Sequence, residues 1–510
     1  MLARVHSAAI LGVEAYEVQV EVDITRGMHN FTVVGLPDAA IRESRDRTAA
    51  AIRNSGFQYP MDRITINLAP ADIRKEGPAF DLPIALGILL ASGQISVDDL
   101  DRTIVVGELS LDGLVRPISG ALPVALGAKS WGKQNVVVPS ANGPEAAVVA
   151  DFDVYGVDSL YGCACLLEQG FMEPPIQVPP EELDLTHTAY GVDFADVKGQ
   201  EHVKRALEVA AAGGHNVLMI GPPGSGKTML ARRMPGILPP MDLSEALEVT
   251  KLYSVSGLIG EKTSLIRTRP FRAPHHTVSV AGLVGGGSVP RPGEVSLAHN
   301  GVLFLDELPE FGAAALEVMR QPMEDATVTI ARAQMSLTFP ANFQLVAAMN
   351  PCPCGFRTDP VRQCTCTSSQ VGRYLKRISG PLQDRIDIHI EVPRLMPEEV
   401  MSRQAGEASQ TIQDRVVAAR ERQRQRFANT PFHCNADMNA KALRQFCPLS
   451  PEVENLLRAA IDQFGLSARA FDRIVKLSRT IADLEGAERI AVHHAAEAVQ
   501  YRSLDRKFWG

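Results

Sequence analysis

The sequence has little cysteine, no excess of positive charge and no long apolar run. Eight cysteines among 510 residues are too few for a disulfide scaffold. The net charge of −8 excludes a broad basic surface, so any nucleic acid must be bound locally, in a pore or groove. The longest apolar stretch, residues 79–91, contains Asp81 and Pro83 and is too short to span a bilayer. Residues 1–20 lack the apolar core and cleavage site of a signal peptide, so we expect a cytoplasmic protein with no membrane partner.

A phosphate-binding loop is the strongest signal in the chain. Residues 221–228, GPPGSGKT, match G-x-x-x-x-G-K-[ST] and lie between an apolar strand at 217–220 and the start of a helix. The glycines let backbone N–H groups face phosphate oxygens. Lys227 is predicted to reach the β- and γ-phosphates and Thr228 to ligate Mg²⁺, so ATP and Mg²⁺ are the expected cofactors. The predicted nucleotide-binding residues are Gly221, Pro222, Pro223, Gly224, Ser225, Gly226, Lys227 and Thr228.

Two later strands are predicted to place polar side chains beside this loop. The strand at 302–305 ends in Asp306, which can reach the Mg²⁺ shell, and Glu307, which can polarise the attacking water. Asn350 lies just past the strand within 344–351, at the edge where open α/β sheets bind ligands. An ordinary acidic strand end and a turn-forming asparagine are the alternatives. The order of the three motifs along the chain favours a hydrolytic site.

Two arginines near the C-terminus are predicted to act on the γ-phosphate. Arg385 resembles the trans-acting finger of AAA+ rings, which stabilises the phosphoryl group held by the neighbouring subunit. A surface ion pair with Asp384 or Asp387 is the alternative. Arg469 matches the arginine that begins the third lid helix of AAA+ proteins, with Arg473 as the second choice. A helix-surface arginine is the alternative there.

Four cysteines are closely spaced, as C-x-C-x₉-C-x-C. Their thiolates could form a tetrahedral Zn²⁺ site that fixes a loop beside Asn350, although free thiols are the equal alternative. The four are Cys352, Cys354, Cys364 and Cys366. The remaining cysteines show no such grouping and are predicted to be buried small hydrophobic residues.

Two insertions lengthen the ATPase region, at 269–301 and 325–342. The second reads as a β-hairpin because two alternating arms flank its centre. Hairpins at these places resemble the helix-two-insert and pre-sensor hairpins of the magnesium-chelatase/MCM branch of AAA+ proteins, which line a central pore in ring helicases. That resemblance implies DNA contacts, with loop packing as the alternative for the two histidines. The implied contacts are Arg272, His275, His276 and Arg332.

The N-terminal part reads as an α/β domain without a phosphate loop. Strands are predicted at 16–24, 31–36, 63–70 and 103–111, with helices at 38–56 and 80–93. Residues 75–93 and 106–129 resemble the segments of Lon-type proteases that carry the catalytic serine and lysine. The serine position falls on Ala79 and the lysine position on Leu122, so the resemblance implies the Lon fold without Ser–Lys chemistry. We expect a docking or assembly role.

The whole chain is predicted to be an α/β protein in four parts. These are a Lon-protease-like domain (1–168), a Pro-rich linker (169–190), an AAA+ parallel-sheet core (191–395) and a helical lid (396–510). The combination resembles the ComM/YifB family of magnesium-chelatase-like proteins. That resemblance implies a homo-hexameric ATPase that translocates on single-stranded or branched DNA and promotes branch migration in natural transformation.

Two other functions remain open from the sequence. One is the ATPase subunit of a metal-inserting chelatase, because the core resembles that subunit. The other is a protein-remodelling or protease-regulating ATPase, which the Lon-like segments suggest. Stimulation of ATP hydrolysis by DNA, by a chelatase partner or by unfolded polypeptide distinguishes the three.

Overall fold

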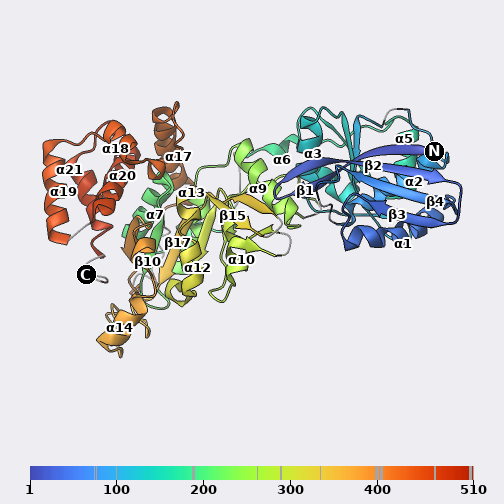
Figure 1. The fold of residues 1–510 in the computed structure, drawn as a ribbon. Helices are drawn as coiled ribbons and strands as arrows, with labels where there is room; N and C mark the ends of the chain where they lie inside the picture. Colours follow the sequence, from blue (N-terminus) through green and yellow to red (C-terminus); the bar gives the residue numbers. More distant parts are fainter. Residues whose placement is uncertain are drawn as a thin grey trace. The chain divides into compact units, whose positions relative to one another are not determined.

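The computed structural model divides the chain into two compact units (Figure 1). The first comprises Met1–Asp184 and Leu243–Arg267, and the second comprises Leu185–Asp242 and Thr268–Gly510. No helix among the described residues combines the length and apolar character needed to cross a bilayer. The structure describes all residues except 74, 76, 99, 186–189, 261, 288–289, 333–334, 397–400, 402–405, 465–466, 505–507 and 509–510.

A mixed seven-stranded sheet, in the order β3-β4-β2-β1-β5-β8-β9, is the centre of the first unit. β2 is antiparallel to β1 and β4, and the other neighbours are parallel. β2, β3 and β4 confirm three predicted strands, whereas β1, β8 and β9 were not predicted. The strands are β1 (Leu2–Leu11), β2 (Glu14–Thr25), β3 (Asn30–Val34), β4 (Arg63–Ala69), β5 (Thr103–Val105), β8 (Asn135–Pro139) and β9 (Asp153–Val157).

The predicted strand over 103–111 is wrong beyond Val105. Gly107 lies so close to α2 that an added Cβ would meet the Leu82 side chain at 3.0 Å. The Leu82 N–H also donates to the Gly107 carbonyl at 3.0 Å. These contacts draw the chain away from the sheet. The residues beyond form a separate short ladder of β6 (Glu108–Leu109) and β7 (Val115–Arg116).

Helices pack on the sheet of the first unit. α1 begins at Asp38, whose carboxylate accepts the Ile41 N–H at 2.8 Å, and ends before Gly56, which has a φ of 86°. α2 is buried along almost its whole length because it packs against β1, β2 and α1. The helices are α1 (Ala39–Asn54), α2 (Asp81–Ala91), α3 (Ala121–Ser130), α4 (Gly143–Ala146), α5 (Leu160–Glu168), α6 (Pro180–Leu183) and α9 (Leu243–Val255), with 3₁₀ turns η1 (Pro78–Phe80) and η2 (Ser140–Asn142).

Helix α9 belongs to the first unit although its sequence lies between ATPase segments. It packs on α3, with Leu247 against the buried cluster that contains Leu122, the position of the Lon lysine. Lys251 pairs with Glu14 at 3.0 Å. The Ser254 carbonyl accepts the N–H of Gly120, just before α3, at 3.1 Å. Leu122, the position at which the Lon resemblance would place a lysine, is therefore buried beneath this contact.

The second unit contains a parallel five-stranded sheet in the order β11-β14-β17-β10-β18. Its three central strands are fully buried, as expected of apolar runs in a parallel sheet. This confirms a mixed α/β protein whose sheet is consistent with an AAA+ core. The strands are β10 (Val217–Ile220), β11 (Phe271–Arg272), β14 (Val302–Leu305), β17 (Gln344–Met349) and β18 (Ile388–Glu391).

Helices surround this sheet, and two short antiparallel ladders project from it. The ladders are β12 (Gly285–Gly286) with β13 (Arg291–Pro292), and β15 (Thr327–Ala331) with β16 (Ser336–Pro340). The second ladder is the hairpin that the alternation predicts. The helices are α7 (Glu201–Gly213), α8 (Lys227–Arg233), α10 (Val280–Val284), α11 (Glu294–Leu297), α12 (Ala313–Val318), α13 (Pro322–Asp325), α14 (Ser368–Leu375) and α15 (Gly380–Gln383), with 3₁₀ turns η3 (Phe194–Asp196), η4 (Met234–Ile237) and η5 (Leu308–Glu310).

The C-terminal part of the second unit is helical, as the sequence predicts. In residues 396–427, whose charge-rich and helix-prone sequence predicts a helix, the structure shows α17, and residues 397–400 and 402–405 lie outside the described residues. α20 ends at Gly486, which has a φ of 81°. The helices are α17 (Ser409–Arg426), α18 (Ala440–Phe446), α19 (Pro451–Phe464), α20 (Ala468–Glu485) and α21 (Val492–Gln500), with the 3₁₀ turn η6 (Asn435–Asp437).

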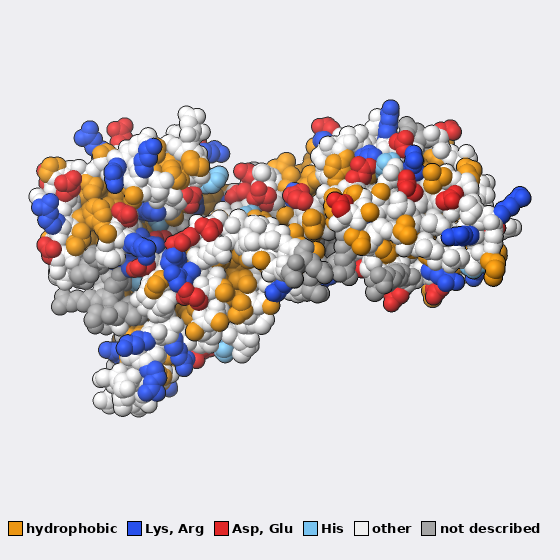
Figure 2. All heavy atoms as spheres, viewed as in Figure 1, with side chains coloured by type: hydrophobic (Ala, Val, Ile, Leu, Met, Phe, Trp, Pro, Cys, Tyr) orange, Lys and Arg blue, Asp and Glu red, His pale blue; other side chains and the backbone are white. Residues whose placement is uncertain are grey.

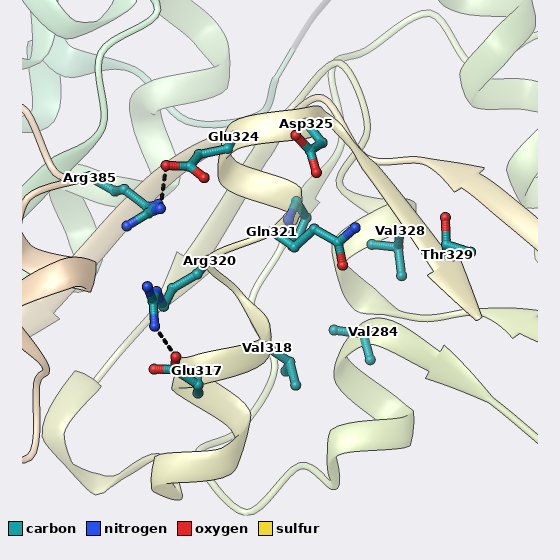
Figure 3. A pocket seen from close by; sticks show the side chains of 11 residues that line it. Val284, Glu317, Val318, Arg320, Gln321, Glu324, Asp325, Val328, Thr329 and Arg385 are labelled. Atoms are coloured by element: carbon teal, nitrogen blue, oxygen red, sulfur yellow. Dashed lines mark hydrogen bonds and ion pairs between the residues drawn. The ribbon is translucent and has the colours of Figure 1, made fainter. Parts of the chain in front are cut away.

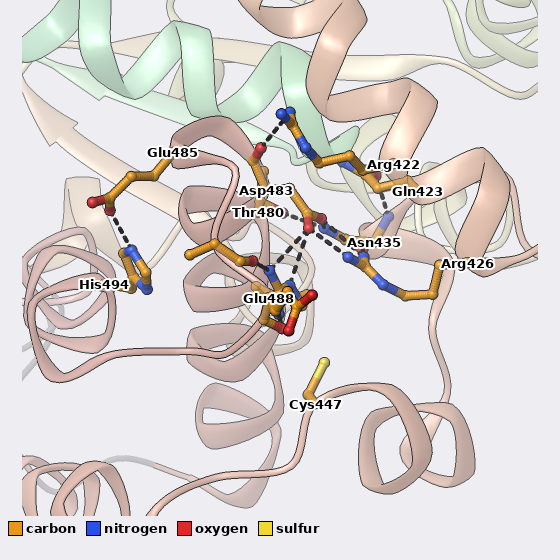
Figure 4. Close-up of polar contacts among 12 residues, drawn as sticks. Arg422, Gln423, Arg426, Asn435, Cys447, Thr480, Asp483, Glu485, Glu488 and His494 are labelled. Atoms are coloured by element: carbon orange, nitrogen blue, oxygen red, sulfur yellow. Dashed lines mark hydrogen bonds and ion pairs between the residues drawn. The ribbon is translucent and has the colours of Figure 1, made fainter.

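A buried carboxylate joins three of these elements (Figure 4). Asp483 of α20 accepts hydrogen bonds from Arg426 of α17 at 2.9 Å, Arg479 at 3.1 Å and Asn435 of η6 at 2.8 Å. Its side chain is 1% exposed, so both arginines are needed to offset the cost of burying the charge. The lid therefore has a polar core that fixes how its helices pack.

We expect Leu247→Asp to destabilise the first unit by about 1–3 kcal/mol, because it places a charge in the contact between α9 and α3. Leu243→Asp, at a position of the same helix that is 50% exposed, should change stability by no more than about 0.5 kcal/mol. Urea unfolding with a probe in the first unit measures both variants. Equal effects would show that α9 is not part of that fold.

Candidate active site

The phosphate loop connects β10 to α8 at the carboxyl edge of the parallel sheet. An added Cβ on Gly221 would lie 2.2 Å from the carbonyl oxygen of Val392. Gly224 and Gly226 have φ angles of 78° and 89°. Glycine is the residue that adopts such positions without strain, so the local sequence dictates the shape of this loop.

The Lys227 side chain folds back over the loop. Its ammonium group donates to the carbonyl oxygens of Gly221 at 2.7 Å and Pro222 at 2.9 Å, and to Asn350 Oδ1 at 3.4 Å. Burial lowers the pKa of Lys227 to about 8, while the two carboxylates after β14 act in the opposite direction. The structure thus brings Lys227 and Asn350 together, as the motif order predicts.

The two predicted Mg²⁺ ligands also meet. The Thr228 hydroxyl donates to Asp306 Oδ2 at 2.7 Å, and joins the first turn of α8 to the end of β14. A hydroxyl and a carboxylate are oxygen donors of the kind that Mg²⁺ prefers in nucleotide sites. These two residues would hold Mg²⁺ beside the β- and γ-phosphates.

Glu307 directly follows Asp306, one of the two predicted Mg²⁺ ligands, and contacts His276. Its φ of 54° is uncommon for a residue with a side chain. Its Oε2 atom lies 3.3 Å from Nδ1 of His276, which packs edge-on against Phe311. From the sequence, His276 is expected in a pore hairpin or in loop packing. The partner of Glu307 was missed because it belongs to the loop after another strand.

Arg385 lies at a cavity beside Glu324 and Arg320 (Figure 3). Its guanidinium pairs with Glu324 of α13 and donates to the Pro381 carbonyl at 2.7 Å. Among the described residues no hydrogen bond or ion pair joins it to the loop or to the carboxylates after β14. The alternative interpretation, an ion pair, is met in kind but with a different carboxylate: Arg385 pairs with Glu324. Asp384 and Asp387 lie next to Arg469 and Arg473 instead. The surrounding cavity has a volume of about 400 Å³ and is lined by polar side chains that include Glu317, Arg320, Gln321, Glu324, Asp325 and Arg385.

The two lid arginines have different environments. Arg469 is 69% exposed and lies 3.7 Å from Asp384. Arg473 instead pairs with Asp387, a buried carboxylate just before β18. Although burial opposes ionisation, Arg473 and His215 hold the pKa of Asp387 well below its usual range. Arg473 is therefore engaged in the protein interior, whereas the side chain of Arg469 is largely exposed to solvent.

Asp387 is also tied to the first strand of the sheet. The Asn216 N–H donates to its carboxylate at 3.2 Å, and the Asn216 side chain donates to the carbonyl of Arg385 at 3.0 Å. Arg502, beyond α21, donates to the carbonyl of Ile386 at 2.6 Å. Residues 385–387 are thus held by the lid and by the strand that leads into the phosphate loop.

The four closely spaced cysteines converge directly after Asn350. Their four sulfur atoms lie within 4.8 Å of one another, and those of Cys352, Cys354 and Cys364 are 3.4 to 3.6 Å apart. Tetrahedral Zn–S bonds of about 2.3 Å require similar sulfur separations, so the four residues fit a zinc ion. An added Cβ on Gly355 would lie 2.6 Å from Pro223 of the phosphate loop. The cysteine cluster therefore supports the loop that binds nucleotide.

Three family models match consecutive parts of the chain. The model described as "Magnesium chelatase, subunit ChlI" matches residues 193–400, which contain the whole site apart from the lid arginines. "Subunit ChlI of Mg-chelatase" matches 20–142, and "Magnesium chelatase, subunit ChlI C-terminal" matches 406–502. The chain therefore carries a magnesium-chelatase-like AAA+ ATPase domain, which implies ATP binding and hydrolysis with Mg²⁺.

Relatives match over nearly the full length. "Uncharacterized protein YifB" of Salmonella typhimurium is 44% identical over 510 residues, which cover 99% of this chain and 98% of the relative. "Competence protein ComM" of Haemophilus influenzae is also 44% identical over 510 residues, with the same coverage of 99% and 98%. The chain belongs to the YifB/ComM family. "Lon protease 2" of Bacillus subtilis is 28% identical over 142 residues, 28% of this chain and 25% of the protease, a weak resemblance of the N-terminal region.

We expect ATP affinity of this YifB/ComM chain to fall as pH rises through about 8, because Lys227 loses its proton there and phosphate binding favours the charged form. At one pH unit above that value the affinity should be roughly tenfold lower. Titration with a fluorescent ATP analogue from pH 7 to pH 9 measures it. Lys227→Arg should remove this dependence, and a profile unchanged in that variant would contradict the assignment.

We expect purified protein to contain a single zinc ion per chain, and Cys364→Ser to lose it. Even loss of an outer partner of a metal ligand weakens binding by about 10–100-fold, so loss of a ligand should leave little metal. Elemental analysis of protein prepared without chelator measures the content. Cys165→Ser, outside the cluster, should keep wild-type zinc, and zinc-free wild-type protein would leave the cysteines as free thiols.

Proposed function

We propose that the chain is a ring-forming ATPase that couples ATP hydrolysis to movement along single-stranded or branched DNA, with branch migration during recombination as its activity. The observation that carries the proposal is the incomplete site. Lys227, Thr228, Asp306 and Glu307 surround one nucleotide position, while Arg385 points elsewhere. A neighbouring copy would supply the missing arginine, and hydrolysis would then require assembly.

Two projecting hairpins support action on a polymer inside a ring. The β12–β13 and β15–β16 ladders correspond to the proposed helix-two-insert and pre-sensor hairpins. Arg332, after β15, donates to the Gly287 carbonyl at 3.3 Å, which joins the two projections. Arg272 forms a two-bond pair with Glu294 at 2.6 and 2.7 Å, so it is a weaker choice for a DNA contact than Arg332.

The contact between His276 and Glu307 would couple the position of the first insertion to the position of the Glu307 carboxylate. His276 lies between β11 and α10, at the base of the first insertion. A shift of that insertion on DNA would change the distance of 3.3 Å between the imidazole and the carboxylate. We assign Glu307 and Asn350 to the water, Arg469 to the γ-phosphate of its own chain, and Arg385 to that of the neighbour.

The printed name of the Haemophilus influenzae relative, a competence protein, supports a role in natural transformation. A homo-hexamer is the assembly we propose, by resemblance to AAA+ rings. The first unit, with Ala79 and Leu122 in place of the Lon dyad, would serve as a scaffold. The second candidate is the ATPase subunit of a metal chelatase, which the descriptions of the three matching models favour.

We expect wild-type ATP turnover to rise on addition of single-stranded or branched DNA, and Lys227→Ala to abolish it. Glu307→Gln should bind ATP without hydrolysing it, because the water loses its polarising carboxylate. Arg385→Ala should lower turnover by about 10³-fold, since a trans arginine contributes on that order. A coupled ATPase assay with single-stranded and with branched DNA measures the turnover of the wild type and of the three variants.

A mixing control separates assembly from folding. Arg385→Ala subunits keep an intact loop and Lys227→Ala subunits keep an intact arginine, so equal mixtures should regain activity that neither parent has. A monomer that hydrolyses ATP at the full rate without Arg385 would end the proposal. An ATPase that ignores DNA but binds a chelatase partner would favour the second candidate.

A further inference from the structure

A segment between β17 and α15 carries positive charge in an acidic chain. We name residues 352–377 the cysteine knuckle. It contains five positive residues, four arginines and one lysine, against one aspartate, while the whole chain has a net charge of −8. That aspartate, Asp359, pairs with Arg394 outside the knuckle at 2.9 Å. Figure 2 shows Lys and Arg side chains gathered on the part of the surface that Figure 1 labels α14.

Four of the five basic side chains are exposed and have no carboxylate partner among the residues that the structure describes. The fifth, Arg377, pairs with Glu310 at 2.6 Å. Arg362 lies over the ring of Phe356, with 5.2 Å between the guanidinium carbon and the ring centroid. The four are Arg357, Arg362, Arg373 and Lys376. Cations beside an aromatic ring are the combination that binds the backbone and bases of single-stranded nucleic acid.

The knuckle is held in a fixed shape, so its charges are positioned in advance. The four cysteines draw its first half together. Thr367 and Gln370 form a capping box at the start of α14, and Val371, Tyr374 and Leu375 bury the opposite face of that helix. A ligand therefore meets a rigid basic surface rather than a mobile tail.

The composition of this surface favours nucleic acid over an acidic protein. Protein interfaces depend on apolar anchors at their centre. Of the large apolar side chains that are exposed in the described structure, Val361 alone lies in the knuckle, at 67% exposure. Interfaces with nucleic acid are more polar and more positive.

The knuckle also touches the phosphate loop. Gly355, with a φ of 85°, approaches Pro223 so closely that an added Cβ would lie 2.6 Å from its ring. The same Cβ would lie 3.9 Å from the Asn350 side chain. A ligand on the knuckle is thus one contact away from the residues that hold the γ-phosphate.

We infer that the cysteine knuckle is a second DNA contact, which binds the phosphate backbone outside the two hairpins and transmits binding to the phosphate loop. This inference rests on the proposed action on DNA. The knuckle lies outside the two hairpins, so DNA bound there makes a separate contact. Because the knuckle touches the phosphate loop, this contact would stimulate ATP hydrolysis.

The test replaces all four cations by glutamate, as Arg357→Glu, Arg362→Glu, Arg373→Glu and Lys376→Glu. The matched control makes the same change at four exposed lid positions, Lys441, Arg444, Arg458 and Arg489, so residue types and charge change are identical. Binding of a single-stranded oligonucleotide by the full chain is measured against salt concentration. Loss of four phosphate contacts should reduce the slope of log K against log salt by about 3, and the control should keep the wild-type slope.

ATP turnover, expressed relative to each variant's own rate without DNA, is the second measurement. We expect the knuckle variant to lose DNA stimulation and the lid control to keep it. A set with glutamine at the four knuckle positions, which is milder for folding, should give an intermediate slope. Equal weakening in the knuckle and lid sets, or an unchanged slope in both knuckle sets, would overturn the inference.

Two further outcomes separate this inference from the proposed function. Wild-type protein that neither binds DNA nor responds to it would refute the action on DNA itself. Wild-type stimulation by DNA that survives in both knuckle sets would refute the knuckle alone. Polyglutamate serves as a probe for an acidic protein partner. If polyglutamate binds the knuckle while DNA binds only the hairpins, the knuckle would be assigned to an acidic protein instead.

Discussion

The buried carboxylate of Asp387 is the point on which the geometry of the second unit depends. It lies where the lid, the first strand of the sheet and the arginine segment meet, and it binds Arg473, His215 and the backbone of Asn216. A buried charge is stable only when such partners surround it, and removal of any one leaves the others unsatisfied. Its role is therefore to fix positions more than to add net stability. It thereby joins helix α20 to residues 385–387 and to the residue just before β10.

The same logic extends around the site. The phosphate loop is confined on one side by the strand that Asn216 begins and on another by Gly355 of the cysteine knuckle. Glu307 is paired with the base of an insertion, and Arg385 with Glu324. The candidate catalytic groups are thus each paired with a residue of another element of the second unit.

Local motifs identified residues that the structure brings together at one edge of the sheet, whereas contacts between distant parts of the sequence could not be predicted. The phosphate loop, Asp306, Glu307 and Asn350 could be found because a strand, a glycine turn and a strand end are encoded within a few residues. The pairing of His276 with Glu307, and of Arg385 with Glu324, joins residues far apart in sequence, where no local pattern distinguishes one carboxylate from another. Periodicity predicted β2, β3, β4, α1 and α2, but not β1, β8 or β9. The chain leaves the seven-stranded sheet at Gly107 because of packing against α2. Hydrophobic periodicity gives no information on such packing.

The position of α9 constrains how this architecture could have arisen. The first unit is completed by a helix that the ATPase sequence supplies, so the chain passes between the two units three times, near residues 184, 242 and 267. Fusion of two independent genes creates only one such passage. A fragment that ends near residue 184 therefore lacks α9 and exposes the surface of α3 that this helix covers.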